Sequence, residues 1–163
     1  RGMTMFMEPK ALYQDPRAAT VIPDDFEVPF GKARIRREGS DLTLITYGNT
    51  THMSLDAAEQ LAGEGFSVEV IDLRSLVPLD KETLIASVKK TNRVLVVHED
   101  KVHGGFGGEV ASILMEEAFE WLDAPVRRVG STFTPVGFHR ELEKAILPNT
   151  DKIYAAAKEL LIY

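Results

Sequence analysis

The sequence predicts an α/β protein, a three-layer α/β/α sandwich in which helices cover both faces of a mostly parallel sheet. Two observations carry this prediction. Short apolar runs of strand length alternate along the chain with longer segments whose apolar residues recur at helical spacing. The run from Val94 to Val97 contains four consecutive apolar residues, three of them β-branched, which is typical of a strand buried on both faces.

Between residues 32 and 92, strand and helix signals follow one another with short turns between them. Glycines and prolines mark the ends of these elements, since they favour turns over regular structure. The expected elements are an edge strand over 32–38, a strand over 42–47, a helix capped by Asn49, Thr50 or Thr51 and running to about Ala62, a strand over 67–73, and a helix capped by Asp80.

The remaining residues predict a strand over 93–97, a polar turn, one long helix, a strand over 126–130 and two terminal helices. The long helix follows a glycine cluster, and its apolar face is expected to contain Phe106, Val110, Ile113, Leu114, Ala118, Trp121 and Leu122. The last helix is expected to be capped by Asp151, with an apolar stripe of Ile153, Ala156, Ala157, Leu160 and Leu161.

The first 31 residues differ from the rest. They hold four of the eight prolines, which favour extended backbone at and before each proline. We interpret residues 1–7, with Met3 to Met7 as a strand, as the remnant of an upstream domain, residues 8–31 as a linker, and residues 32–163 as the folded domain. The chain begins at Arg1 rather than at a methionine, and we expect it to be a piece of a longer protein.

Composition excludes several classes of function. The net charge of −6 disfavours general binding to nucleic acids or anionic membranes. The absence of cysteine removes disulfides, thiolate metal sites and cysteine nucleophiles. No apolar run approaches the roughly 18 residues that a transmembrane helix needs, and no signal-peptide pattern is present.

His98 and Glu99 stand at the carboxyl end of the buried strand, where ligands and partners of open α/β sheets usually bind. Three interpretations remain open: hydrogen bonds that close the strand end, a charged interface pair, or an acid–base pair that serves a neighbouring subunit. His103 lies five residues after His98, and no further ligand type clusters nearby, so a metal site is disfavoured.

The glycine cluster begins with Gly104 and Gly105, ahead of Phe106. Its spacing does not fit a dinucleotide fingerprint, because Val110 stands where the third glycine belongs, and the lysine of a phosphate loop is missing. The glycines are expected either to allow close helix packing or to make backbone contacts with a partner or ligand. The apolar end, Leu161-Ile162-Tyr163, is expected either to pack on its own domain or to dock to a partner.

Several motifs in order along the chain carry a family resemblance. They are Glu-Pro-Lys-x-Leu-Tyr at 8–13, Val-Pro-Phe-Gly-Lys-Ala at 28–33, Ser-Asp-Leu-Thr-Leu-Ile-Thr-Tyr-Gly at 40–48, Val-Ile-Asp-Leu-Arg-Ser-Leu-Val-Pro-Leu-Asp at 70–80, and His98-Glu99 followed by Gly104-Gly105-Phe106. Together they resemble the C-terminal half of the β-subunit of thiamine-dependent 2-oxoacid dehydrogenases, which act on pyruvate, branched-chain 2-oxoacids or acetoin.

The resemblance implies a transketolase C-terminal-like domain with five strands, the first antiparallel to the others. It implies that the whole enzyme decarboxylates a 2-oxoacid oxidatively and transfers the acyl group to a lipoyl arm. Thiamine diphosphate and magnesium would bind between domains that this chain lacks. No catalytic, cofactor-binding or metal-binding residue is therefore expected in it.

The implied partners are the α-subunit or pyrophosphate domain, a second β-subunit and the dihydrolipoyl acyltransferase core. The implied location is the bacterial cytoplasm or the mitochondrial matrix. The candidate interface or docking residues are His98, Glu99, His103, Gly104, Gly105, Phe106, Leu161, Ile162 and Tyr163. Two alternatives remain: a free-standing α/β module that binds a small anion at the Gly48 or Gly104 turn, and a fragment of a related transketolase-type enzyme.

Overall fold

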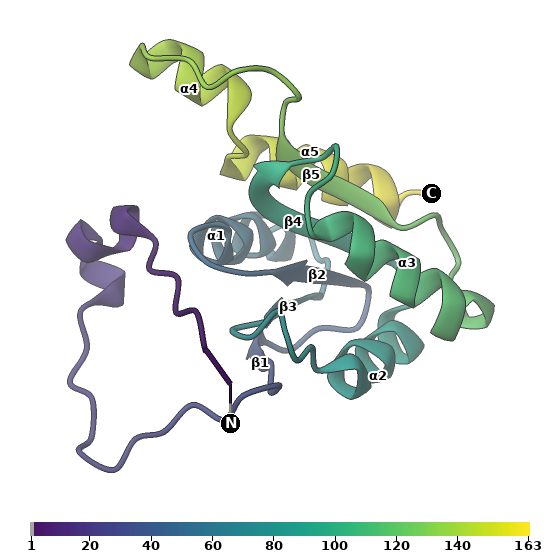
Figure 1. Cartoon of the computed structure of the whole chain (residues 1–163). Coiled ribbons are helices and arrows are strands. Elements are labelled where there is room, and N and C mark those ends of the chain that lie inside the picture. Colours follow the sequence, from purple (N-terminus) through teal and green to yellow (C-terminus); the bar gives the residue numbers. More distant parts are fainter. Residues whose placement is uncertain (1) are drawn as a thin grey trace.

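The computed structural model describes residues 2–163, and Arg1 lies outside this part. Its sheet has five strands in the order β1-β3-β2-β4-β5 (Figure 1). β1 pairs antiparallel with β3, and the other neighbouring strands pair in parallel, so the predicted mixed sheet is confirmed. The strands are β1 (Arg34–Arg37), β2 (Leu42–Thr46), β3 (Val68–Asp72), β4 (Val94–Lys101) and β5 (Arg127–Ser131).

Helices cover both faces of this sheet, which confirms the three-layer architecture (Figure 1). One face packs against α1 (Thr50–Ala62) and α5 (Thr150–Leu161), and the other packs against α2 (Lys81–Thr91) and α3 (Gly107–Glu117). The short α4 (Arg140–Ile146) stands away from the layers on a projecting segment.

The alternation of side chains along each strand builds the two cores. Leu95 and Val97 of β4 point into the α1–α5 core, while Val94 and Val96 point into the α2–α3 core, and all four are fully buried. Each such side chain contributes about 1.5–3 kcal/mol by leaving water. A strand that feeds two cores must be apolar at every position, which explains the unbroken run in the sequence.

β4 is longer than expected. The polar residues after Val97, expected to form a turn, instead extend the strand to Lys101. Lys101 pairs with Ser131 of β5 after a register shift, and the Val102 N–H donates to the Ser131 carbonyl at 3.1 Å. Pairing with β5, a tertiary contact, therefore keeps this polar stretch extended.

The long helix expected over 106–122 is shorter. α3 ends at Glu117, and a separate 3₁₀ turn, η3 (Phe119–Trp121), follows Ala118, whose φ of −140° is not helical. The Asn92 side chain donates to the Trp121 carbonyl at 2.7 Å and ties this turn to the end of α2. That contact comes from a residue distant in sequence, and helical periodicity carries no sign of it.

The capping residue of α5 was also predicted incorrectly. Asn149, rather than Asp151, caps the helix, and its side-chain oxygen accepts from the Lys152 N–H at 2.9 Å. Asn149 has extended backbone angles and so can turn its side chain back over the first helical N–H groups. Asp151 already lies within the first turn.

The N-terminal segment carries no strand at 3–7, where one was expected. Met3, Met5, Phe6 and Met7 are all exposed, and no neighbouring strand among the described residues pairs with them. The predicted linker contains the 3₁₀ turns η1 (Lys10–Gln14) and η2 (Pro16–Ala18).

A pair of hydrogen bonds anchors the linker to the folded domain. Arg17 donates two hydrogen bonds, of 3.0 and 3.2 Å, to the carboxylate of Asp56 on α1. The domain boundaries at residues 7 and 31 remain predictions. No helix of the described part combines the length and apolar character needed to cross a membrane.

Candidate functional site

The carboxyl end of β4 places His98 and Glu99 on opposite faces of the sheet, because successive side chains of a strand alternate. His98 lies on the α3 side and is completely buried. Glu99 is exposed on the α1 side, where its carboxylate accepts from the Asn49 side chain at 3.2 Å. The two side chains therefore do not form an acid–base pair.

The imidazole of His98 fills a space that three glycines leave open. A methyl group on Gly107, at the start of α3, would overlap the ring. A methyl group on Gly105 or on Gly130 of β5 would lie 2.9 Å from Cε1 of the ring, which is closer than van der Waals contact allows. These glycines let α3 and β5 close over the histidine, so close packing explains the buried glycines of the cluster.

Aromatic rings complete the surroundings of His98. The Tyr47 ring lies parallel to the imidazole with centroids 6.3 Å apart, and Phe106 meets Tyr47 edge-on at 6.2 Å. Neither ring nitrogen of His98 has a hydrogen-bond partner among the described residues. In this arrangement the imidazole is enclosed by packing contacts.

Burial lowers the pKa of His98 below its usual value, because the apolar surroundings penalise the imidazolium form. The Asp100 carboxylate raises this pKa and the Arg128 guanidinium lowers it, but burial is the largest effect. Burial likewise raises the pKa of Tyr47 to about 12, with a smaller contribution from Asp100. Both groups are therefore neutral at pH 7.

Hydrogen bonds close the end of β4, but the side chains of His98 and Glu99 do not make them. The Ser131 hydroxyl donates to the Glu99 carbonyl, and the Lys101 N–H donates to the Asp100 carboxylate at 2.7 Å. The Arg128 guanidinium donates to the Val102 carbonyl at 2.9 Å. These contacts bind the end of β4 and its loop to β5.

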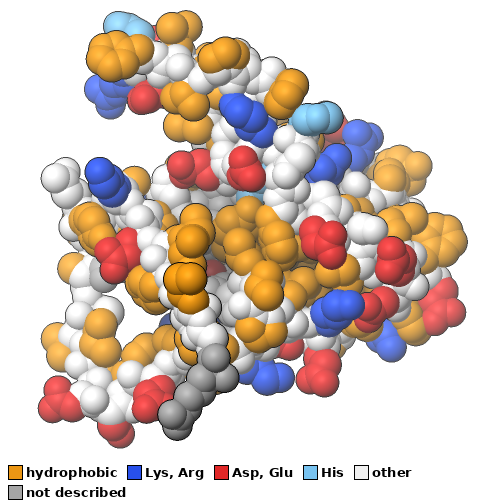
Figure 2. Space-filling model, viewed as in Figure 1, with side chains coloured by type: hydrophobic (Ala, Val, Ile, Leu, Met, Phe, Trp, Pro, Cys, Tyr) orange, Lys and Arg blue, Asp and Glu red, His pale blue; other side chains and the backbone are white. Residues whose placement is uncertain are grey.

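His103 and Gly104 are exposed on the loop between β4 and α3. The His103 ring packs on Phe133 with centroids 4.6 Å apart, and Lys101 donates to the Thr134 carbonyl. Both contacts hold the base of the projecting segment, residues 132–146. Figure 2 shows that this segment stands out from the body with hydrophobic side chains along it, and Phe133, Val136 and Phe138 are exposed.

At Gly105 and Gly107 the glycine loop offers no open cradle for phosphate, whereas the space beside Gly104 is open. Gly105 and Gly107 are buried, and the space beside them is filled by His98 and the Lys101 carbonyl. Within residues 2–163, no group of three or more histidine, aspartate or glutamate side chains is placed to hold a metal ion. The described residues therefore do not fit thiamine diphosphate with its magnesium, which needs a phosphate cradle and oxygen ligands.

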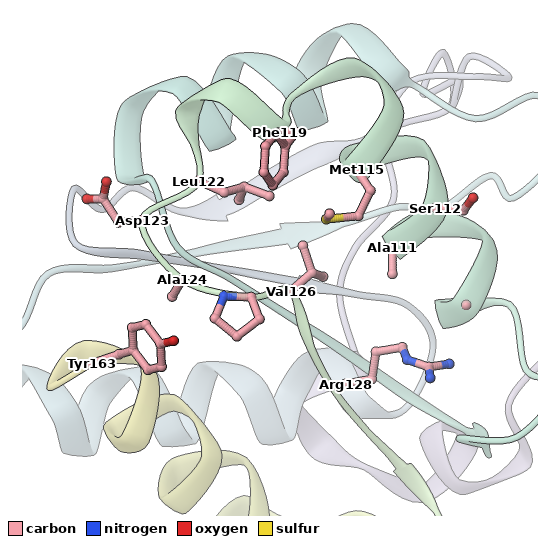
Figure 3. A pocket seen from close by; sticks show the side chains of 12 residues that line it. Ala111, Ser112, Met115, Phe119, Leu122, Asp123, Ala124, Val126, Arg128 and Tyr163 are labelled. Carbon is pink, nitrogen blue, oxygen red and sulfur yellow. The ribbon is translucent and has the colours of Figure 1, made fainter.

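Of the three C-terminal docking candidates, one packs on the core and two are exposed. Leu161 packs against the α1–α5 core, whereas Ile162 and Tyr163 are 70% and 71% exposed. Tyr163 forms one wall of an open groove of about 650 Å³ between α3 and β5 (Figure 3). We call it the α3–β5 groove.

The α3–β5 groove extends between the two predicted docking surfaces, the glycine loop and the C-terminal end. It runs along α3 and into η3, from Gly108 next to the glycine loop to Phe119, with Tyr163 on the opposite side. Its upper wall carries Met115 and Phe119, which are exposed apolar residues outside the predicted core face of the helix. Apolar residues outside the core face of an amphipathic helix can indicate a contact surface. The sequence analysis did not use this signal at Met115 and Phe119.

Arg128 and Asp123, which also line the groove, were missed as well. Nothing in the sequence indicates that Arg128 shares a groove with Tyr163. Tyr47 was likewise seen only as the last residue of a strand. Its stacking on His98 depends on the neighbouring positions of β2 and β4 in the sheet.

The fold is thus a five-stranded mixed sheet in the order β1-β3-β2-β4-β5 with helices on both faces. Residues 31–153 match the family described as "Transketolase, C-terminal domain". The chain belongs to this family, as the sequence motifs predicted.

Within this family, the chain is similar to β-subunits of 2-oxoacid dehydrogenases. The chain is 42% identical over 156 residues to pyruvate dehydrogenase E1 component subunit beta-2 of Oryza sativa subsp. japonica, covering 94% of this chain and 42% of that protein. It is 42% identical over 157 residues to 2-oxoisovalerate dehydrogenase subunit beta of Bacillus subtilis, covering 96% of this chain and 48% of that protein. The chain thus spans about half the length of these relatives.

A solved structure described as "Split gene transketolase, inactive beta4 tetramer" superimposes on the chain with a TM-score of 0.75 and 31% sequence identity. The superposition covers 88% of this chain and 46% of that one. The transketolase of Pichia stipitis superimposes with a TM-score of 0.58 at 13% identity, which shows a shared fold only.

Proposed function

We propose that this chain is the C-terminal domain of the β-subunit of a thiamine diphosphate-dependent 2-oxoacid dehydrogenase, and that it serves assembly and docking. The observation that carries the proposal is about 40% identity to such β-subunits over nearly the whole chain. In the complete enzyme, a 2-oxoacid would be decarboxylated oxidatively and its acyl group passed to a lipoyl arm. The chain alone would be inactive.

The geometry favours a role in assembly and docking over a role in catalysis. His98 is neutral and buried, Glu99 is paired with Asn49, and the glycine loop is filled. Thiamine diphosphate and magnesium would then be held by other parts of the enzyme. The exposed apolar residues of the linker, the projecting segment and the α3–β5 groove supply surface for partners.

The proposed partners are the α-subunit or pyrophosphate domain, a second β-subunit and the dihydrolipoyl acyltransferase core. Contact between β chains is supported by the similar solved structure, which is described as a beta4 tetramer. The location would be the bacterial cytoplasm or, in a eukaryote, the mitochondrial matrix. A fragment of a transketolase-type enzyme is the second candidate, with 31% identity to the split gene transketolase against 42% to the dehydrogenase β-subunits.

The alternative, a free-standing anion-binding module, is tested by calorimetric titration of the chain with phosphate and with thiamine diphosphate plus magnesium. That module would hold the anion at the Gly48 or Gly104 turn. We expect no binding in the micromolar range, because assembly is the role that we propose for the chain. Tight binding by the isolated chain would overturn the proposed function and favour the module.

Docking is tested by titrating the chain with the subunit-binding domain of a dihydrolipoyl acyltransferase. Leu161 should be kept because it packs against the core, so the informative variant replaces Ile162 and Tyr163 with alanine. We expect a loss of affinity of tenfold or more, since exposed apolar anchors dominate such interfaces. Val21→Ala, at an apolar linker position that is 93% exposed, is the control. Unchanged affinity in the double variant would remove docking from the C-terminal end.

A further inference from the structure

The sheet ends on one side in β1, whose outer edge pairs with no other strand of residues 2–163 (Figure 1). The backbone groups of an antiparallel strand point alternately to its two sides, so half of the N–H and C=O groups of β1 face away from β3. Such a row of groups is a template on which another extended chain can pair. The side chains along the edge decide which chain can approach.

The segment that leads into β1 and forms it is strongly basic. Four of the six residues at 32–37 are lysine or arginine and none is acidic, although the net charge of the whole chain is −6. Most of the strand is open to solvent: Arg34, Ile35 and Arg36 are exposed, and Arg37 is half-buried. The outer edge of β1 therefore carries a local excess of positive charge.

Carboxylates of the domain neutralise only part of this charge. The Lys32 ammonium lies 3.5 Å from the Glu82 carboxylate, and the Arg36 guanidinium lies 3.5 Å from the Asp72 carboxylate. These two cations are paired within the domain. They are therefore less available to a partner than the remaining ones.

Three arginines at this edge form no salt bridge with any residue of the described part, namely Arg34, Arg37 and Arg74. Hydrogen bonds to backbone hold two of them at the ends of the strand. Arg74 donates to the Lys32 carbonyl at 2.9 Å, and Arg37 donates to the Val68 carbonyl at 2.8 Å. A guanidinium has five N–H donors, so donors remain for a further acceptor.

This edge disfavours a second copy of the same chain. If two β1 edges paired, arginines of one copy would approach arginines of the other, and opposed like charges destabilise a pair of strands. Charged edge strands commonly prevent self-association in this way. The same arginines attract an acidic segment, because a carboxylate can accept two parallel hydrogen bonds from one guanidinium.

An apolar position accompanies the charges. Ile35 is 38% exposed, and it pairs with Ile71 of β3, which is fully buried in the α2–α3 core. Successive side chains of a strand point to opposite faces, so Ile35 and Arg34 lie on different faces of the sheet. A strand that continues this pattern places acidic side chains on one face and apolar side chains on the other.

We propose that the outer edge of β1 binds an extended segment of another protein in which acidic and apolar residues alternate, and that this segment adds to the sheet as a sixth strand. Main-chain hydrogen bonds supply the affinity, and the unpaired arginines select the acidic segment. The proposal goes beyond the proposed assembly function and does not depend on it.

The test uses fluorescence anisotropy of a labelled peptide, Thr-Glu-Val-Glu-Val-Glu-Thr with blocked ends, titrated with the whole chain at about 0.05 M salt. We expect saturable binding. Arg34→Glu should weaken it by about tenfold or more, because a repulsive contact replaces an attractive one. Raising the salt to about 0.5 M should also weaken it, since the charges lie at the surface.

Three controls separate strand addition from general attraction between charges. The same peptide with every interior amide N-methylated keeps its charge but lacks the N–H donors, and it should not bind. A peptide with lysine in place of each glutamate should not bind either. Arg127→Glu reverses an exposed arginine at the start of β5, the opposite edge of the sheet, and it should leave the affinity unchanged.

Circular dichroism checks that Arg34→Glu is folded, as expected for an exposed residue without a salt bridge. The N-methylated peptide tests the unmodified chain and needs no variant. Absence of saturable binding would overturn the proposal. So would binding that survives N-methylation, which would indicate general attraction to anions, or an equal loss in Arg127→Glu. None of these results bears on the titrations with thiamine diphosphate and the acyltransferase domain, so failure of strand addition leaves the proposed function standing.

Discussion

Replacing Gly107 by alanine tests whether His98 is the reason for the glycine cluster. Gly107 is the first residue of α3, where alanine normally favours the helix over glycine by about 0.5–1 kcal/mol. Here the added methyl group would overlap the buried imidazole and come within 3.3 Å of Val96. Overpacking of this kind costs about 1–3 kcal/mol, so the helix gain is outweighed.

Gly108 is the matched control, because it occupies the next position of the same helix. A methyl group there would meet only the end of the Arg128 side chain, at 3.3 Å, and that side chain can shift. Gly108→Ala should therefore be neutral or stabilising. The helix-propensity gain is common to both variants and cancels in the comparison, which leaves Gly107→Ala less stable by about 1–3 kcal/mol.

The assay is urea unfolding followed by circular dichroism, with the change in midpoint read at constant slope. A double-mutant cycle with His98→Ala isolates the contact, since the methyl group should cost little once the imidazole is gone. Equal stability of the Gly107 and Gly108 variants, or a cycle with no coupling, would refute the packing explanation of the glycines.

Two further predictions concern acid stability and the α5 cap. Folding lowers the pKa of His98 from its usual 6.5. Between the folded and the unfolded pKa, the unfolded chain therefore binds more protons than the folded chain. The free energy of unfolding consequently rises with pH across this window, and it falls as the pH drops below about 6.5. Urea unfolding between pH 5 and 7.5 should show this slope in the native chain and a smaller one in His98→Gln, and equal slopes would contradict the assignment. Asn149→Ala should destabilise the chain by about 1 kcal/mol through loss of its bond to the Lys152 N–H, whereas Asp151→Ala should change stability by less than about 0.5 kcal/mol. The reverse order in the same assay would restore Asp151 as the cap.

The elements that the sequence predicted well are those whose signal lies within a few neighbouring residues. The apolar run at 94–97 must be a strand buried on both faces, and the periodic apolar positions of α5 define one side of that helix. The motif at 70–80 and its companions were sufficient to recognise the family, and the family supplied the antiparallel position of β1.

The errors share one cause, which is contact between residues distant in sequence. β4 continues to Lys101 because β5 pairs with it, and α3 stops at Glu117 with η3 tied to Asn92 across the fold. No pattern of neighbouring residues contains these contacts. The expected strand at 3–7 failed for the converse reason, since a strand without a partner leaves its backbone groups unpaired.

The sequence by itself determined the fold class, the family and the position of the polar groups at the end of β4, because hydrophobic periodicity and motif order are local properties. Only the tertiary structure decided the roles of those groups. It buried His98 beneath Gly105, Gly107 and Gly130, directed Glu99 to the opposite face, and brought Arg128, Asp123 and Tyr163 to one groove. Burial and pairing depend on which surfaces the folded chain brings together.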